Sequence, residues 1–423
     1  MLTLNAIKSD PEKIIQLLSV KNFDAKNIIN QILETDRLRR ETQQELDKTL
    51  AEFNEISRQI GKYIKEGNKE LADNIKEKAD FLKTKSKEIS KQLSDIEHQL
   101  DELLLKLPNT PHFSVHKGNS SEDNEIVCSY GDIVQFTNRL LPHWELASKF
   151  KIIDFELGSK ITGTGFPVYK GKGAKLQRAL ISFFLDKAIN AGYTEIQPPL
   201  MVNEASAYGT GQLPDKDEQM YFVPLDNFYL VPTAEVPVTN IYRNVILKYN
   251  ELPIKNVAYS ACFRREAGSY GKDVRGLNRL HQFDKVEIVQ IQHPDNSYNA
   301  LNEMVEYVAS LLKDLQLPYR IVRLCGADLS FTSALTYDFE VYSAAQQKWL
   351  EVSSVSNFET FQANRMKLKF KDVDGTTKLA HTLNGSALAL PRIMSALLEN
   401  NQKNNSIEIP EAIVPYTGFN AID

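Results

Sequence analysis

The sequence predicts an α+β protein made of an N-terminal helical hairpin and a larger domain that mixes strands and helices. The hairpin is predicted because residues 26–107 contain no proline and only two glycines, while apolar residues recur at helical spacing. The mixed domain is predicted because, after Pro108, segments with β character alternate with helices and glycine-bearing loops up to Asp423. Pro108 therefore marks the boundary between the two patterns.

The second half of the predicted hairpin carries the clearer helical pattern. Its apolar positions alternate between spacings of three and four, as in a coiled-coil seam, at Ala79, Leu82, Ser86, Ile89, Leu93, Ile96, Leu100, Leu103 and Leu107. The first half carries a looser stripe, formed by Leu46, Leu50, Phe53, Ile56, Ile60 and Ile64. We expect two antiparallel helices separated by residues 61–67, with the tip of the hairpin near Gly67.

Positive side chains gather in the tip half of this hairpin, at Arg58, Lys62, Lys65 and Lys69. Cations on a rigid helical arm suit the phosphate backbone of a nucleic acid. Acidic residues such as Glu66 are interleaved with them, which fits a solvated surface equally well. A coiled coil can also serve oligomerisation or spacing, so the hairpin alone leaves these interpretations open.

The composition is that of an ordinary globular protein, with 42% hydrophobic and 25% charged residues and a formal net charge of −5. This charge argues against a protein that coats nucleic acid through bulk positive charge. No apolar run is long enough to cross a membrane, and the N-terminal residues do not resemble a secretory signal. The three scattered cysteines fit neither a disulfide framework nor a zinc site, so we expect a cytoplasmic protein without structural zinc.

The most informative segment, residues 258–290, has the pattern strand, glycine-rich loop, strand. Because side chains alternate along a strand, Arg264 and Glu266 share a face for as long as the first strand persists. The returning strand presents on one face Phe283, Lys285 and Glu287. The loop adds Gly268, Gly271, Lys272, Arg275, Gly276 and Arg279. An exposed, salt-bridged hairpin is the alternative, and it accounts for the charges but not for the glycines or the aromatic ring.

A second segment, residues 379–399, places Pro391 where a helix would begin and Arg392 in its first turn. A cation there opposes the helix dipole, so an anion bound between Arg392 and the helical N–H groups would relieve both. A solvent-exposed arginine is the alternative. The sequence has neither the phosphate loop of P-loop NTPases nor the full glycine fingerprint of dinucleotide-binding folds, so a nucleotide would need another kind of site.

These two segments carry a resemblance to a known family. Residues 263–266, with Phe283 and Glu287, resemble motif 2 of class II aminoacyl-tRNA synthetases, and residues 384–392 resemble motif 3. The helix that ends in residues 192–199 resembles motif 1, the dimer-forming segment. With the hairpin, these motifs, at about residues 175–199, 257–290 and 379–399, resemble bacterial-type seryl-tRNA synthetases over essentially the whole chain.

The resemblance implies a mainly antiparallel sheet flanked by helices, preceded by the hairpin at about residues 26–107. It implies an N-terminal tRNA-binding domain over residues 1–110 and a catalytic domain over residues 111–423. The implied reaction activates L-serine with ATP and Mg²⁺, then transfers serine to the terminal adenosine of serine tRNA and also of selenocysteine tRNA. The implied partners are the tRNA, bound through the hairpin, and a second copy of the chain in a homodimer, with no membrane.

By motif position, the resemblance assigns the site residues to four groups. The catalytic group is Arg264, Glu266 and Arg392. The ATP-binding group is Arg264, Arg265, Glu266, Arg279, Phe283, Glu351, Val352, Ser353, Ser354 and Arg392, of which Glu351 and Ser354 would hold Mg²⁺ with ATP. The serine-binding group is Thr233, Ala234, Glu235, Arg264, Glu287, Asn384 and Ser386. The tRNA-binding group is Arg58, Lys62, Lys65 and Lys69.

Two other functions stay open at this point. A class II-like amino acid:carrier-protein ligase would form adenylates without charging tRNA, but relatives of that kind lack the hairpin. A non-catalytic coiled-coil scaffold with a decayed synthetase domain would not need charged and aromatic residues at the motif positions.

Overall fold

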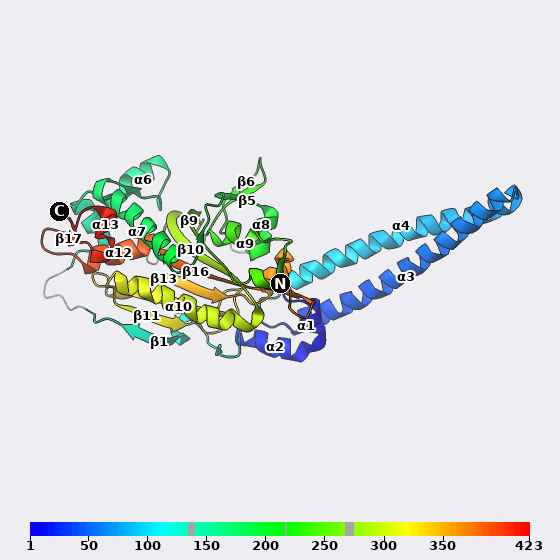
Figure 1. The fold of residues 1–423 in the computed structure, drawn as a ribbon, viewed down its shortest axis with the longest axis horizontal. Helices are drawn as coiled ribbons and strands as arrows, with labels where there is room; N and C mark the ends of the chain where they lie inside the picture. The colour runs from blue at the N-terminus through cyan, green and yellow to red at the C-terminus, as the bar shows by residue number, and fades with distance from the viewer. Residues whose placement is uncertain (134–139, 216–217, 267–274) are drawn as a thin grey trace. The chain divides into compact units, whose positions relative to one another are not determined.

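The computed structural model describes residues 1–133, 140–215, 218–266 and 275–423, and it divides the chain into two units (Figure 1). The smaller unit comprises Leu2–Ser19 and Phe23–Pro108, and the larger unit comprises Met1, Val20–Asn22 and Asn109–Asp423. Each unit has apolar clusters of its own. Within the described ranges, no helix combines the length and the apolar character that crossing a membrane requires.

Two long helices make up most of the smaller unit, and they lie side by side in Figure 1. The helices of this unit are α1 (Leu4–Ser9), α2 (Pro11–Val20), α3 (Lys26–Lys65) and α4 (Lys69–Leu105). The predicted hairpin with its tip near Gly67 is confirmed, and Gly67 has a φ of +76°, which favours glycine. The predicted break at Gly61 is wrong, because one glycine weakens a helix without ending it.

The seam between α3 and α4 is apolar, largely as the spacing predicts. Its buried clusters are Leu46 with Ile89 and Leu93, and Ile56 with Ala79 and Leu82. The prediction is wrong for Leu50 and Ile64, which are exposed. Thr49 is buried in place of Leu50, because the alternation of three and four residues that starts at position 46 reaches position 49.

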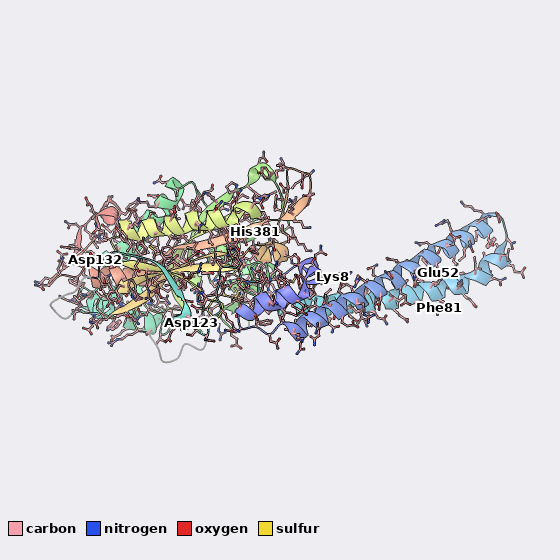
Figure 2. The ribbon with its side chains drawn as sticks, turned by 90° about the horizontal axis from the view of Figure 1, so that it is seen from below. Lys8, Glu52, Phe81, Asp123, Asp132 and His381 are labelled. Carbon is pink, nitrogen blue, oxygen red and sulfur yellow. The ribbon has the colours of Figure 1, made fainter. Side chains whose placement is uncertain are left out.

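Near the open end of the hairpin, an ion pair ties α1 to α3. Lys8, which is labelled in Figure 2, belongs to α1. Its Nζ lies 2.9 Å from Asp36 Oδ2, and Arg39 also contacts this carboxylate at 3.0 Å. Asp36 is only 1% exposed, so its charge is balanced by cations rather than by water.

An eight-stranded sheet is the main element of the larger unit, in the order β1-β11-β12-β13-β16-β10-β9-β4. Neighbouring strands are antiparallel except β4 and β9, which are parallel. The predicted antiparallel sheet flanked by helices is thereby confirmed. In sheet order the strands span Glu125–Tyr130, Tyr319–Arg323, Leu335–Ser343, Lys348–Asn357, His381–Ala389, Gln282–Gln292, Ile254–Phe263 and Thr194–Glu195.

Helices and short strands surround this sheet. The helices are α5 (His143–Lys149), α6 (Phe155–Ile161), α7 (Gly171–Asn190), α8 (Glu204–Thr210), α9 (Glu235–Asn240), α10 (Ser297–Asp314), α11 (Phe361–Met366), α12 (Leu390–Asn400) and α13 (Val414–Thr417). The short strands form small sheets: β2 (Ile153–Asp154) with β3 (Val168–Tyr169); β5 (Met201–Asn203), β6 (Phe222–Val223) and β7 (Phe228–Leu230); β8 (Ile246–Lys248), β14 (Lys369–Lys371) and β15 (Thr377–Leu379); and β17 (Ile407–Glu408) with β18 (Ala421–Ile422).

The alternation of side chains along β10 separates the two faces of the large sheet. Val286 and Ile288 belong to the main hydrophobic cluster, which also contains residues of α7, α10 and α12. Val289 faces the other way and packs with Val238 of α9. Glu287 lies on the same face as Val289, so the face next to α9 also carries acidic residues of the candidate site.

The motif 2 segment departs from its predicted pattern where the first strand ends. β9 stops at Phe263, and Glu266 has a φ of +50°. The strand alternation, expected for as long as this strand persists, therefore does not extend to Arg264 and Glu266. Gly268, Gly271 and Lys272 of the predicted loop lie outside the described residues.

The motif 3 segment contains a bulge followed by a helix start. Ala387 and Leu388 of β16 together lie opposite one residue of β10, and Leu388 has a φ of +78°. Pro391 is predicted to be the first residue of the helix. α12 begins one residue earlier, at Leu390, so Pro391 is its second residue. Arg392 lies in the first helical turn, as predicted.

Candidate active site

A cavity of about 560 Å³ opens beside the central strands of the large sheet. Its walls come from the segment before α9, the residues that follow β9, the first half of β10, strands β13 and β16, and the first turn of α12. Among the lining residues are Thr233, Glu235, Arg264, Glu266, Arg279, Phe283, Lys285, Glu287, Glu351, Val352, Ser353, Ser354, Asn384, Ser386 and Arg392. One cavity thus collects three arginines, an aromatic ring and several carboxylates.

Arg392 and Arg279 are anchored by neighbouring protein groups. Arg392 Nε donates to the Asn278 carbonyl oxygen at 3.3 Å, and its Nη1 donates to the Glu351 carbonyl oxygen at 2.6 Å. Arg279 Nε lies 3.0 Å from Glu266 Oε2. A guanidinium carries five N–H donors, so each arginine can bind an oxyanion while it keeps its contact to the protein.

Arg264 lies against the ring of Phe283, with 5.2 Å between Cζ and the ring centroid. Its Nε donates to the Pro232 carbonyl oxygen at 3.3 Å. Its backbone N–H donates to the His281 carbonyl oxygen at 2.9 Å, which continues the pairing of the two chain segments beyond Phe263. A fixed cation beside an aromatic face suits a ligand that carries both an anionic group and a flat ring.

Glu235 and Glu287 form a buried acidic pocket in the cavity. Glu287 is 1% exposed, lies 2.5 Å from Lys285 Nζ and accepts a hydrogen bond from Ser386 Oγ at 3.3 Å. Glu235 accepts from Gln362 Nε2 at 2.6 Å. When both carboxylates are ionised, they and the one ammonium group leave a single net negative charge, which suits a ligand with one cationic group.

The Glu235 side chain has an unusual titration. Burial, and then the nearby Glu287 carboxylate, raise the pKa of Glu235 to about 7, while the hydrogen bond from Gln362 acts in the opposite direction. The Gln362 amide is itself oriented, because its Oε1 accepts from Thr382 Oγ1 at 2.7 Å and its Nε2 also donates to the Thr210 carbonyl oxygen. The charge of Glu235 therefore depends on pH in the physiological range.

Two oxygen donors, Glu351 and Ser354, line another part of the cavity, and a third, Asp338, is the strand neighbour of one of them. Ser354 Oγ lies 3.4 Å from Glu351 Oε1, and Asp338, the strand neighbour of Ser354 on β12, is 9% exposed. Asp338 Oδ1 has no hydrogen-bond partner among the described residues. Burial and the Glu351 carboxylate raise the pKa of Asp338. Carboxylate and hydroxyl oxygens are the ligands that Mg²⁺ prefers, so the donor set fits that ion.

The predicted site residues fall into two places. The residues assigned to catalysis, ATP and serine line the cavity, except Ala234 and Arg265, which are not among the described lining residues. Ala234, the residue just before α9, is fully buried and packs with Val238 and Val289. The four predicted tRNA-binding cations lie in α3 and α4 of the smaller unit, where Arg58 and Lys62 contact acidic neighbours at 3.5 and 3.9 Å.

Sequence reasoning did not assign several residues that the structure places at the site. Lys285 lines the cavity and pairs with Glu287. The strand alternation placed it on the same face as Phe283 and Glu287, but no site role was assigned to it. Asn278 and Gln212 also line the cavity, and Gln362 holds Glu235. These three come from loops and from α11, where no periodic pattern marks a functional side chain.

Comparisons with known proteins agree along the whole chain. Residues 1–111 match the model of the seryl-tRNA synthetase N-terminal domain, and residues 222–401 match the tRNA synthetase class II core domain (G, H, P, S and T). A serine–tRNA ligase from Salinibacter ruber is 51% identical over 99% of this chain and 98% of that protein.

Two solved structures show the same fold. The seryl-tRNA synthetase from Pyrococcus horikoshii, complexed with ATP, has a TM-score of 0.91 at 31% identity and covers 100% of this chain and 99% of its own. The cytoplasmic serine–tRNA ligase from Naegleria fowleri, in complex with AMP, has a TM-score of 0.86 at 24% identity, over 98% of this chain and 96% of its own.

Proposed function

The chain belongs to the seryl-tRNA synthetase family, and on this premise we propose how the residues of its cavity perform the family's reaction. The protein ligates serine to tRNA at the expense of ATP. The serine carboxylate attacks the α-phosphorus of ATP and pyrophosphate leaves; the terminal ribose hydroxyl of tRNA then attacks the activated carbonyl and AMP leaves. One observation carries the proposal: a single cavity combines arginines, an aromatic ring and a buried acidic pocket.

ATP occupies the arginine-rich part of the cavity in this proposal. Arg264 holds the α-phosphate, and Arg279 and Arg392 hold the remaining phosphates. Phe283 stacks on one face of the adenine and Arg392 covers the other, while Glu266 accepts from the adenine amino group. Because the substrate supplies the nucleophile, the protein needs only to align two anions and to stabilise the charge of the transition state.

Three further residues belong to the proposed ATP site through their position. Val352 and Ser353 line the cavity on β13, and Ser353 Oγ donates to the Ser386 carbonyl oxygen at 2.6 Å, which joins β13 to β16. Arg265 follows Arg264 directly, and its backbone N–H donates to the Gln219 carbonyl oxygen at 2.8 Å. We assign Arg265 to the ATP site because it is adjacent in the chain to Arg264.

Serine occupies the acidic pocket in this proposal. Glu235 and Glu287 face its ammonium group, and Thr233, Asn384 and Ser386 surround its hydroxyl. Ala234 belongs to this group through its place between Thr233 and Glu235. The support is charge and burial, since the pocket is acidic and its carboxylates are nearly inaccessible to water. A polar pocket of this kind rejects alanine, because alanine would leave buried polar groups unpaired.

Glu351 and Ser354 hold Mg²⁺ in the proposed complex. The described residues contain no group of three or more His, Cys, Asp or Glu side chains that could hold a metal ion. Glu351 and Ser354 would therefore hold the ion only together with ligands from outside the protein. When bound, Mg²⁺ neutralises charge on the phosphates.

We further propose the partners and the location of the protein. Serine tRNA, and also selenocysteine tRNA, bind along the hairpin through Arg58, Lys62, Lys65 and Lys69, which read backbone and shape more than bases. The chain acts as a homodimer through its motif 1 region. The three cysteines are free, which supports a reducing cytoplasm.

Arg264 is the first residue to test. The Arg264→Ala variant should lose serine-dependent pyrophosphate exchange by about a thousandfold or more, as expected for the loss of a charge-stabilising group. Arg320→Ala is the matched control, because Arg320 lies on β11 of the same sheet and pairs with Glu340 outside the cavity lining. Near-normal exchange in Arg264→Ala would refute the phosphate role.

A further inference from the structure

A buried histidine contacts the segment that leads into the proposed phosphate site. His143 is the first residue of α5 and is fully buried. Its Nε2 accepts a hydrogen bond from the Leu277 backbone N–H at 2.8 Å, and its Nδ1 lies 2.7 Å from Glu399 Oε1. The ring therefore connects α5, the end of the motif 2 loop and α12.

The contacts determine where the imidazole carries its proton. A backbone N–H can only donate, so Nε2 of His143 must be the unprotonated acceptor. The proton of the neutral ring then lies on Nδ1, where it faces the Glu399 carboxylate and Ser395 Oγ, which is 2.7 Å away. The pairing with a carboxylate fixes this tautomer and orients the ring.

Glu399 also organises a second contact to the same segment. Its Oε1 accepts from Gln346 Nε2 at 2.9 Å, and Gln346 Oε1 accepts from Asn278 Nδ2 at 2.9 Å. The carboxylate thus acts on consecutive residues by two routes, through His143 to Leu277 and through Gln346 to Asn278. Glu399 is fully buried, and its oxygens are held by His143, Ser343 and Gln346.

The segment held in this way contacts one cavity arginine and leads directly into another. The carbonyl oxygen of Asn278 accepts from Arg392 Nε at 3.3 Å, and Arg279 follows directly in the chain. Gly276, just before Leu277, has a φ of +68°, and a Cβ atom there would lie 2.2 Å from His143 Nε2. The backbone therefore approaches the imidazole more closely than any residue with a side chain would allow.

We propose that His143 is a positioning residue for the ATP site: by accepting the Leu277 N–H, it fixes the backbone that orients Arg392 and Arg279. The proposal rests on the assignment of these arginines to the phosphates of ATP. His143 itself is separated from the cavity by the segment it holds, so its effect is transmitted through Leu277 and Asn278. No part of the serine pocket belongs to this set of contacts.

Steady-state pyrophosphate exchange with the full chain tests the proposal through two Michaelis constants. In His143→Leu, the KM for ATP should rise about tenfold, the effect of roughly one lost hydrogen bond, while the KM for serine changes less than about twofold. His143→Gln should restore most of the ATP affinity, because its amide oxygen can accept the Leu277 N–H. Gln346→Met breaks the second route, from Glu399 through Gln346 to Asn278, and should also raise the KM for ATP. If His143→Leu does not fold, Gln346→Met takes its place in the test.

Two controls separate the possible outcomes. Leu146→Ala removes a buried side chain of the same helix, and it should lower stability while it leaves the KM for ATP unchanged. An unchanged KM for ATP in the His143 and Gln346 variants, or an equal rise of both constants, would overturn the proposal. Arg392→Ala tests the underlying assignment: if it alone impairs ATP binding, only the role of His143 is wrong, and if it has no effect, the proposed ATP site is wrong as well.

Discussion

Glu235 is the residue whose charge is most sensitive to pH in the proposed serine pocket. It is buried, next to a second carboxylate, and its pKa is raised to about 7. The ammonium group of serine binds the ionised form, so binding must shift Glu235 toward deprotonation. Serine affinity is therefore coupled to a proton near neutral pH.

The coupling gives a signed prediction. Below pH 7 the ionised fraction of Glu235 falls by up to about tenfold per pH unit, so the KM for serine should rise several-fold between pH 8 and pH 6. The KM for ATP should change less over this range. Pyrophosphate exchange measured across pH tests this, with Glu235→Gln as the variant that loses the dependence. A flat serine KM between pH 6 and 8 would show that Glu235 does not bind the ammonium group in its ionised form.

At the residue scale, the sequence could indicate side chains that contact a ligand but not the residues that support them. Arg264, Phe283 and Glu287 lie in a segment where cations, glycines and an aromatic ring occur together. Gln362 and His143 support this site from α11 and α5, and neither belongs to a periodic pattern with the residue it holds. Only the folded chain shows these distant contacts.

At the element scale, the hairpin shows what helical spacing can and cannot predict. The seam of α4 follows from its strict alternation of three and four, whereas the seam of α3 shifts from Leu50 to the polar Thr49. Packing against α4 decides the position because a seam residue must face the partner helix, even when its neighbour is more apolar. Gly61 and Gly67 differ for a similar reason, since only Gly67 needs a positive φ.

The tip of the hairpin carries the prediction for tRNA. Replacement of Lys62, Lys65 and Lys69 by alanine should weaken binding of serine tRNA, because three exposed cations near the tip are removed. The slope of log K against log salt should become shallower by up to about 2 units. Filter binding at several salt concentrations measures both effects.

Pyrophosphate exchange is the control for the same variant, and it should stay unchanged because none of the three lysines lines the cavity. An unchanged tRNA affinity would mean that these lysines only form a solvated surface. The pairing of Lys62 with Glu66 at 3.9 Å is too weak to prevent contact with a phosphate.

At the scale of the whole molecule, the strand order could not be predicted from periodicity. β13 and β16 are neighbours, and β16 also pairs with β10, so residues near positions 285, 354 and 386 lie side by side. The two strands of residues 258–290 were recognisable by their own pattern, but the neighbours of a strand depend on long-range packing. The family resemblance supplied what the residue pattern lacked, namely which segments form one site.

The most direct measurement is a crystal structure of the full chain with a non-hydrolysable analogue of seryl-adenylate. We expect the adenine against Phe283, the phosphate analogue at Arg264, and the ammonium group between Glu235 and Glu287. A ligand bound outside this cavity, or bound in it with its ammonium group away from both carboxylates, would contradict the proposed site.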